Sequence, residues 1–251
     1  MNTYFSATIN TNPFQMFSVS HVLALCVFAA LNIALVFWFA KKKAGKPVDR
    51  FRYFLAVFLL ANEILSVLWS AAAGVFTLDY ALPIQLCDAA AFLSAAMLLW
   101  GYQLPFELVY FWGLGGSLQA LITPDLYYPF PHFVFFNFFF THGAIVTAVF
   151  YMIAAKGCKP TLRSVGKTVL CTNLYAGLIA VVNRLTGGNY MFLSHKPEGA
   201  SVLDFLGPWP WYLLSLEGVL LATCLVLYSP FAVRNWIRQA ENRRGDRRER
   251  T

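Results

Sequence analysis

Charge is scarce in this chain, because only 12% of its 251 residues are charged whereas 59% are hydrophobic. Soluble globular domains carry roughly 25% charged and about 45–50% apolar residues. So little polar surface cannot cover a water-soluble globule of this size, and so apolar a composition also excludes intrinsic disorder. The composition therefore predicts an integral membrane protein.

Cysteine is also sparse, with five residues and no C-x-x-C pair. A secreted disulfide scaffold needs much denser cysteine. Internal repeats, domain linkers and low-complexity stretches are not recognisable either, so the chain is expected to form one compact helical bundle.

Long apolar runs are what the chain does contain. A helix needs about 20 mostly apolar residues to cross about 30 Å of hydrocarbon. The seven candidate runs are residues 18–40, 53–74, 82–101, 104–122, 133–155, 165–186 and 208–232. Only a short hinge at Gly101 separates the third run from the fourth. The pattern predicts an all-α polytopic membrane protein, a seven-transmembrane-helix bundle.

The basic residues orient this predicted bundle. Of the 19 Lys and Arg residues, 17 lie in three segments, residues 41–52, 156–167 and 234–250. The positive-inside rule places these segments in the cytoplasm, with the N-terminus outside and the C-terminus in the cytoplasm. The excess of positive charge thus encodes orientation and indicates no nucleic-acid partner.

Three regions follow from this topology. Residues 1–17 are predicted to be an extracytoplasmic leader, 18–232 the seven-helix transmembrane domain, and 233–251 a basic cytoplasmic tail. The expected location is a cell membrane, the inner or plasma membrane of a bacterium. Membrane lipids are the expected partners, and the oligomeric state stays open.

Polar residues within the spans are costly and usually face a bundle interior or a cavity. At 1.5 Å per helical residue, Glu63 and His142 each lie roughly 16 Å below a membrane surface. Cys87 and Asp88 lie near the outer end of the third run. Glu107 is expected at the cytoplasmic interface.

A thiol and an imidazole in a partly dry site suggest nucleophilic catalysis, because histidine can take the thiol proton and generate the reactive thiolate. On that plan Cys87 attacks a lipid ester and His142 is general base and then general acid. Orientation or oxyanion donors would come from neighbouring polar groups. The candidates for this supporting role are Asn62, Glu63, Asp88, Asn173 and Glu217.

The last outer connection is rich in aromatic, Gly and Pro residues, which fits an interfacial belt and also a lid over an outward-facing pocket. The candidate pocket or lid residues are His21, Asn183, Asn189, Tyr190, Trp209 and Trp211. His132, in the preceding outer loop, is expected to be solvated.

Two other functions use the same residues. A membrane hydrolase could hold zinc through His21, Glu63, Asp88 and His142, although no H-E-x-x-H motif is present. A bundle with an outward polar pocket could instead bind or carry a small solute without catalysis. The acyl-transfer interpretation itself needs no metal or other cofactor.

Five stretches carry a resemblance to a known family. They are residues 82–88 (LPIQLCD), 107–125, 139–143 (FFTHG), 189–197 and 206–212 (LGPWPWY). Together they resemble the bacterial YwaF-like integral membrane family, in order and over nearly the whole chain. That family is similar to the eukaryotic transmembrane protein 164 group, which has been associated with cysteine-dependent acyl transfer between phospholipids. The resemblance implies a nucleophile at Cys87 and a partner at His142.

Overall fold

The computed structural model describes residues 4–8, 12–42, 45–101, 103–197 and 202–248, and every regular element within them is helical. The long helices are α1 (Val19–Lys42), α2 (Lys46–Ala72), α6 (Phe133–Ala154), α7 (Leu162–Thr186) and α8 (Trp211–Arg248). The shorter elements are α3 (Leu86–Trp100), α4 (Gln103–Phe111), the π-helix η1 (Trp112–Ser117), α5 (Leu118–Ile122), and the 3₁₀ turns η2 (Tyr190–Phe192) and η3 (Val202–Leu206). The predicted all-helical class is confirmed.

Five helices, α1, α2, α6, α7 and α8, are long and apolar enough to cross a membrane. Each contains most of one predicted run. The last of them differs most from the prediction, because α8 is continuous past residue 232 and ends at Arg248.

The third and fourth predicted runs form shorter elements. The third run is helical only from Leu86, after Pro83, and stops at Gly101, whose φ of 73° suits glycine. The 15 residues of α3 extend about 22 Å at 1.5 Å per residue. The fourth run is helical but is divided by η1 into α4 and α5. The structure therefore supports five spanning helices, and crossings by these two segments stay a prediction.

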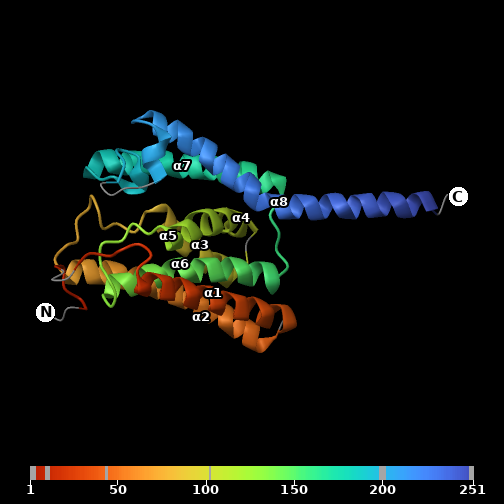
Figure 1. Cartoon of the computed structure of the whole chain (residues 1–251), viewed down its shortest axis with the longest axis horizontal. Helices are drawn as coiled ribbons and strands as arrows, with labels where there is room; N and C mark the ends of the chain where they lie inside the picture. The colour runs from red at the N-terminus through yellow and green to blue at the C-terminus, as the bar shows by residue number, and fades with distance from the viewer. Residues whose placement is uncertain (1–3, 9–11, 43–44, 102, 198–201, 249–251) are drawn as a thin grey trace.

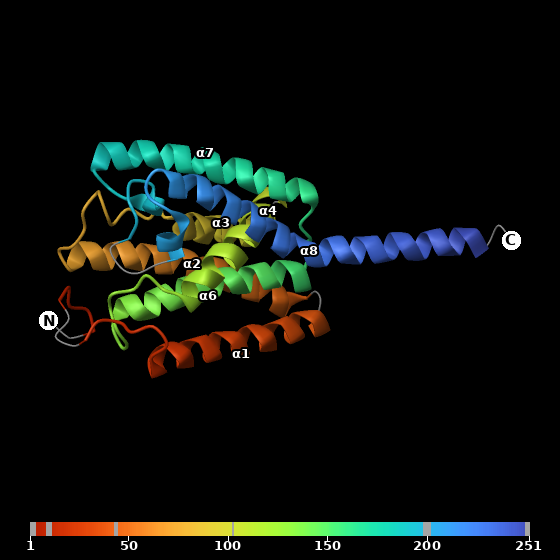
Figure 2. The ribbon, with the colours of Figure 1, turned by 45° about the horizontal axis from the view of Figure 1, so that its top comes forward.

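The helices run along one common direction, with α3 and α4 inside the bundle and α1 and α7 on opposite sides (Figures 1 and 2). Among the long helices α6 is the most enclosed, because 67% of its most apolar stretch is buried, against 6% in α8. The main core joins α2, α3, α4 and α6 through fully buried side chains such as Leu59, Met97, Phe106 and Val149.

The connections gather at two ends of the bundle. At one end Lys156 Nζ lies 3.1 Å from Asp49 Oδ1, and Arg52 donates a 3.0 Å hydrogen bond to the Leu98 carbonyl. These contacts join the start of α2 to the ends of α6 and α3, and we call this the basic end. Successive segments therefore run in alternate directions between the basic end and the opposite end.

The described leader residues lie against the opposite end, which we call the leader end. The Phe133 N–H donates to the Tyr4 carbonyl at 2.8 Å, and the Phe14 N–H donates to the Tyr127 carbonyl at 2.9 Å. The leader thus packs onto the connection between α5 and α6. Residues 1–3, 9–11 and 249–251 of the predicted leader and tail lie outside the described residues, and the three region boundaries remain predictions.

Candidate functional site

Cys87 lies in the first turn of α3, which begins beside the loop after α7. Gln85 precedes the helix, and its N–H donates to Asp88 Oδ2 at 2.8 Å. The Gln85 side-chain oxygen accepts a 2.8 Å hydrogen bond from the Met191 N–H. Both bonds hold the helix start in place. A helix leaves its first N–H groups without helical acceptors, which favours negative charge near Cys87, whereas the neighbouring Asp88 and Glu63 carboxyl groups oppose it.

The π-helix η1 places Ser117 against this thiol. Ser117 is fully buried, and its hydroxyl has no hydrogen-bond partner within the described residues. The Cys87 side chain lies near this hydroxyl. Single π-helical turns within α-helices occur frequently at functional sites. Glycine in η1 also permits close packing, because a Cβ on Gly113 would lie 3.0 Å from Ile145 Cγ2.

Two carboxyl groups complete the surroundings of Cys87. Asp88 is its chain neighbour, and Glu63 from α2 interacts electrostatically with both residues. Glu63 is only 5% exposed, whereas Cys87 keeps partial exposure although α3 lies within the bundle. Cys87, Asp88 and Glu63 thus lie near one another, as does Ser117, which the sequence did not point to, and their roles stay a prediction.

His142 is buried in the middle of α6. Its Nδ1 lies 2.7 Å from the Phe138 carbonyl oxygen, and its ring centroid is 4.2 Å from that of Phe138. A carbonyl oxygen can only accept, so Nδ1 carries the proton. The neutral ring therefore keeps the Nε2 lone pair available as a base.

Asn62 fixes the relative height of these groups. Its side-chain amide donates to the Thr141 hydroxyl and, at 2.9 Å, to the Asn137 carbonyl. Glu63 and His142 each follow one residue after this contact, so they lie at one level of the bundle. No hydrogen bond among the described residues joins Cys87 to His142, and their proximity stays a prediction.

Asn173 and Glu217 lie apart from this group. Asn173 Nδ2 donates to Glu217 Oε2 at 2.9 Å, which links α7 to α8, and also to the Val169 carbonyl at 3.0 Å within its own helix. Asn173 is exposed on the surface of the bundle. The contacts therefore pair these two residues with each other and not with Cys87.

His21, predicted as a pocket residue, is fully buried at the start of α1. Its Nδ1 accepts from the Phe17 N–H at 2.9 Å, and its Nε2 donates to the Leu121 carbonyl at 2.9 Å. Both ring nitrogens are thus engaged with backbone groups. This leaves no lone pair of the neutral ring for a metal. Within the described residues no group of three or more His, Cys, Asp or Glu is placed to hold a metal ion.

Asn183 and Tyr190 anchor the connection between α7 and α8. The Asn183 amide donates to the Tyr190 carbonyl at 3.0 Å and accepts from the Tyr190 N–H at 2.8 Å. The Tyr190 hydroxyl donates to the Leu78 carbonyl at 3.0 Å and accepts from the Leu82 N–H at 2.9 Å. These bonds tie together two connections of the leader end, the one that follows α7 and the one that leads into α3 and Cys87.

The remaining predicted lid residues shape the same connection. Asn189 donates to the His195 carbonyl at 2.8 Å and accepts from the Ser194 N–H at 3.0 Å, which closes a turn. Trp209 donates to the Leu193 carbonyl at 3.2 Å but is 59% exposed, and Trp211 is 67% exposed. The two tryptophans therefore match an interfacial belt better than a pocket wall.

His132 is buried rather than solvated, contrary to the expectation. It is 3% exposed, its ring stacks on Tyr128 with centroids 4.2 Å apart, and its Nε2 donates to the Ser6 carbonyl at 3.0 Å. Its Nδ1 accepts from the Val134 N–H and so caps α6. Burial lowers the pKa of His132, and the bond to Ser6 opposes this only in part.

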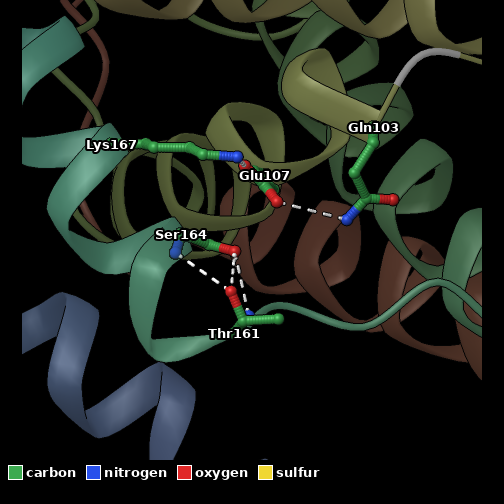
Figure 3. A network of polar contacts seen from close by, with 5 residues as sticks. All are labelled: Gln103, Glu107, Thr161, Ser164 and Lys167. Carbon is green, nitrogen blue, oxygen red and sulfur yellow. Dashed lines mark hydrogen bonds and ion pairs between the residues drawn. The ribbon is translucent and has the colours of Figure 1, made fainter.

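A second polar network lies near the basic end (Figure 3). Lys167 Nζ of α7 lies 2.7 Å from Glu107 Oε2 of α4, and the Gln103 amide approaches Glu107 Oε1 at 3.4 Å. Glu107 is 4% exposed, so it is an interior residue and not an interfacial one. Nearby, Thr161 and Ser164 exchange the hydrogen bonds that begin α7.

The long apolar helices, the buried polar contacts between them and the comparison below define a multi-pass helical membrane protein. The chain belongs to the TMEM164 family, whose pattern it matches over residues 16–228. This match covers α1 to α7 and most of the membrane part of α8, with Cys87 and His142 inside it. Searches of curated proteins and of solved structures gave no match.

Proposed function

We propose that this protein is a Cys/His-dependent phospholipid acyltransferase that reacts at Cys87. The observation that carries the proposal is the buried Ser117 hydroxyl, which lies near the Cys87 thiol and has no hydrogen-bond partner within the described residues. A buried hydroxyl without a partner is costly. The cost of burying the Ser117 hydroxyl is explained if this hydroxyl positions the Cys87 thiol or donates a hydrogen bond to the reacting group.

The chemistry requires two balanced steps. The Cys87 thiolate attacks the ester carbonyl carbon of a phospholipid, a C–S bond forms, and the ester C–O bond breaks to release a lysolipid. The hydroxyl of a second lysolipid then attacks the thioester, and the C–S bond breaks to return the thiolate. The helix N-terminus at Cys87 stabilises negative charge on sulfur and on the tetrahedral oxygen.

His142 supplies the proton transfers in this proposal. Its unprotonated Nε2 takes the thiol proton, gives it to the leaving lysolipid, and takes the proton of the incoming hydroxyl in the second step. The shared level of Glu63 and His142 supports this assignment, since Glu63 also lies near Cys87. Asn62 and Glu63 then act as positioning groups.

We also propose that all seven segments cross the membrane, with the N-terminus outside and the basic end in the cytoplasm of a bacterial cell. The alternating direction of the segments supports seven crossings. The basic residues near the α1–α2 and α6–α7 connections support this orientation. Cys87 then faces the outer leaflet, in which its lipid substrates lie.

The test uses purified protein with a phospholipid labelled in its acyl chain and an unlabelled lysolipid acceptor. Cys87→Ser and His142→Ala are expected to lower transfer at least about 100-fold, because each removes a group from the chemical step. Cys171→Ser is the matched control, since Cys171 is half-buried in α7 and belongs to the packing around the core. It should keep activity.

Ser117→Ala distinguishes a positioned thiol from a merely buried one. The variant is expected to lower the rate of thioester formation more than it changes the amount of folded protein. Equal transfer by the wild type and by the Cys87→Ser and His142→Ala variants would refute the proposal. Release of free fatty acid instead of transfer would identify a hydrolase, and tight binding of a small solute without turnover would indicate a non-enzymatic role.

A further inference from the structure

The end of α8 extends beyond the bundle (Figures 1 and 2). Residues 211–232 of the helix are already about 33 Å long, which is enough to cross the hydrocarbon. Among the described side chains of α8, the last that packs on the core is Phe231, whose ring lies 5.9 Å from that of Tyr110. Residues 233–248, which we call the distal segment, are therefore not needed for the crossing.

The distal segment has an apolar stripe that faces solvent. Val233, Trp236 and Ile237 are 55%, 71% and 45% exposed. With Ala240 they follow the spacing i, i+3, i+4, i+7, so they lie on one face of the helix. Single exposed apolar residues are common, but an exposed stripe of this kind indicates that something covers it.

Positive charge lies beside this stripe. Arg234 and Arg238 are exposed and lie one turn apart on one side of the apolar face. The remaining sequence of the segment adds four arginines against two acidic residues, Glu241 and Asp246. An apolar face with a tryptophan and flanking arginines is typical of helices that lie in the headgroup region of anionic membranes.

The helix contains a weak point where the distal segment begins. Pro230 has no N–H, so the Val226 carbonyl lacks its usual helical donor. The Ser229 hydroxyl donates to this carbonyl at 2.8 Å, and the Tyr110 hydroxyl donates to the Leu227 carbonyl at 2.8 Å. Side chains thus satisfy two carbonyls around Pro230, and the helix can bend there at little cost in hydrogen bonds.

We propose that the distal segment bends at Pro230 and binds the adjacent membrane surface as an amphipathic helix that selects anionic lipids. Its apolar stripe enters the headgroup boundary, and Arg234 and Arg238 contact lipid phosphates. A second copy of the chain fits the stripe less well, because the flanking arginines would bring like charges together along a helix pair. This inference is independent of the proposed acyl transfer.

The test measures the depth of spin labels on the full-length protein in lipid vesicles. Single cysteines replace Ile237 on the stripe and Asn235 on the opposite face, in a background whose five native cysteines are alanine. Vesicles contain phosphatidylcholine with or without phosphatidylglycerol. Each label is examined for collisions with oxygen, which concentrates in hydrocarbon, and with a water-soluble nickel complex.

With phosphatidylglycerol present, the Ile237→Cys label should collide mainly with oxygen and the Asn235→Cys label mainly with nickel. Adding Arg234→Gln and Arg238→Gln should weaken binding roughly 25-fold, at about fivefold per arginine, and return the Ile237→Cys label to water. Nickel access at both sites in anionic vesicles would overturn the proposal. So would protection of the Ile237→Cys label from both reagents with spin–spin broadening, because that pattern indicates a second copy.

Discussion

Asn62 and Asn137 exchange hydrogen bonds across the centre of the bundle. The Asn62 amide donates to the Asn137 carbonyl at 2.9 Å, and the Asn137 amide donates to the Asn62 carbonyl at 2.8 Å. Each amide thus binds a carbonyl that is already part of a helix. The pair fixes the register of α2 against α6, and with it the level that Glu63 shares with His142.

Replacing either member of this pair with leucine should lower stability by about 1 kcal/mol, since hydrogen bonds between membrane helices contribute about 0.6 to 1.7 kcal/mol. The measurement is the thermal unfolding of Asn62→Leu, Asn137→Leu and the double variant in detergent. Because the two residues act together, the double variant should cost less than the sum of the single ones. Strict additivity would contradict the coupling.

Gly143, next to His142, allows a close approach of α1 to α6. A Cβ at this position would lie 2.4 Å from the Phe28 ring, so Gly143→Ala must displace that ring. We expect a loss of about 1–3 kcal/mol, as for other overpacked sites. Gly177→Ala is the control, because nothing lies within 4 Å of its added Cβ. Similar unfolding temperatures for the two variants would contradict the close contact.

The Glu107–Lys167 pair should be asymmetric, because Glu107 is buried while the Lys167 side chain is 49% exposed. Lys167→Met leaves a buried carboxylate alone and is expected to cost about 2 kcal/mol, a value reduced from that of fully buried pairs by the exposure of the lysine. Glu107→Gln leaves the ammonium in water and should cost less. In thermal unfolding, the double variant should recover part of the stability that Lys167→Met loses. A larger loss for Glu107→Gln than for Lys167→Met would contradict the expected asymmetry.

His132 should make the leader end sensitive to acid. Its pKa is lowered in the folded protein from an ordinary value of 6.5, so the folded state binds the proton less readily than the unfolded chain does. Stability is therefore fully present above that pH and declines as the pH falls below it. Protonation would also place a donor on Nδ1 opposite the Val134 N–H. The measurement is the unfolding temperature as a function of pH.

His132→Asn provides the control for this titration. Asparagine caps helices well but does not titrate, so this variant should lose most of the decline in unfolding temperature below pH 6.5. An unchanged decline would assign the acid sensitivity to another group.

Hydropathy predicted α1, α2 and α7 well, because each of them is a single long apolar helix. It was less accurate for α3, which is shorter than the continuous apolar run that contains it. The helix begins only after Pro83, and it ends at Gly101, which has the αL conformation. The distal part of α8 was also missed as helix, since a basic sequence lowers hydropathy without preventing a helix.

Depth along the spans predicts which polar residues lie at similar levels of the bundle, but it gives no information on direction around a helix axis. Asn173 and Glu217 were assigned to the group around Cys87 for that reason, although they face each other on the surface between α7 and α8. Ser117 was missed because a single serine in an apolar run carries no signal of its own. The neighbouring glycines of η1 were the available indication of a π-helix.

The Tyr190 hydroxyl bridges two connections that are more than 100 residues apart in the chain. Tyr190 is 1% exposed, so neither connection can lift away without breaking bonds in the other. We therefore expect these two connections to open together, because lifting either one breaks hydrogen bonds to the other. We expect a lipid substrate of the proposed reaction to approach Cys87 between helices, from the plane of the bilayer, without such an opening.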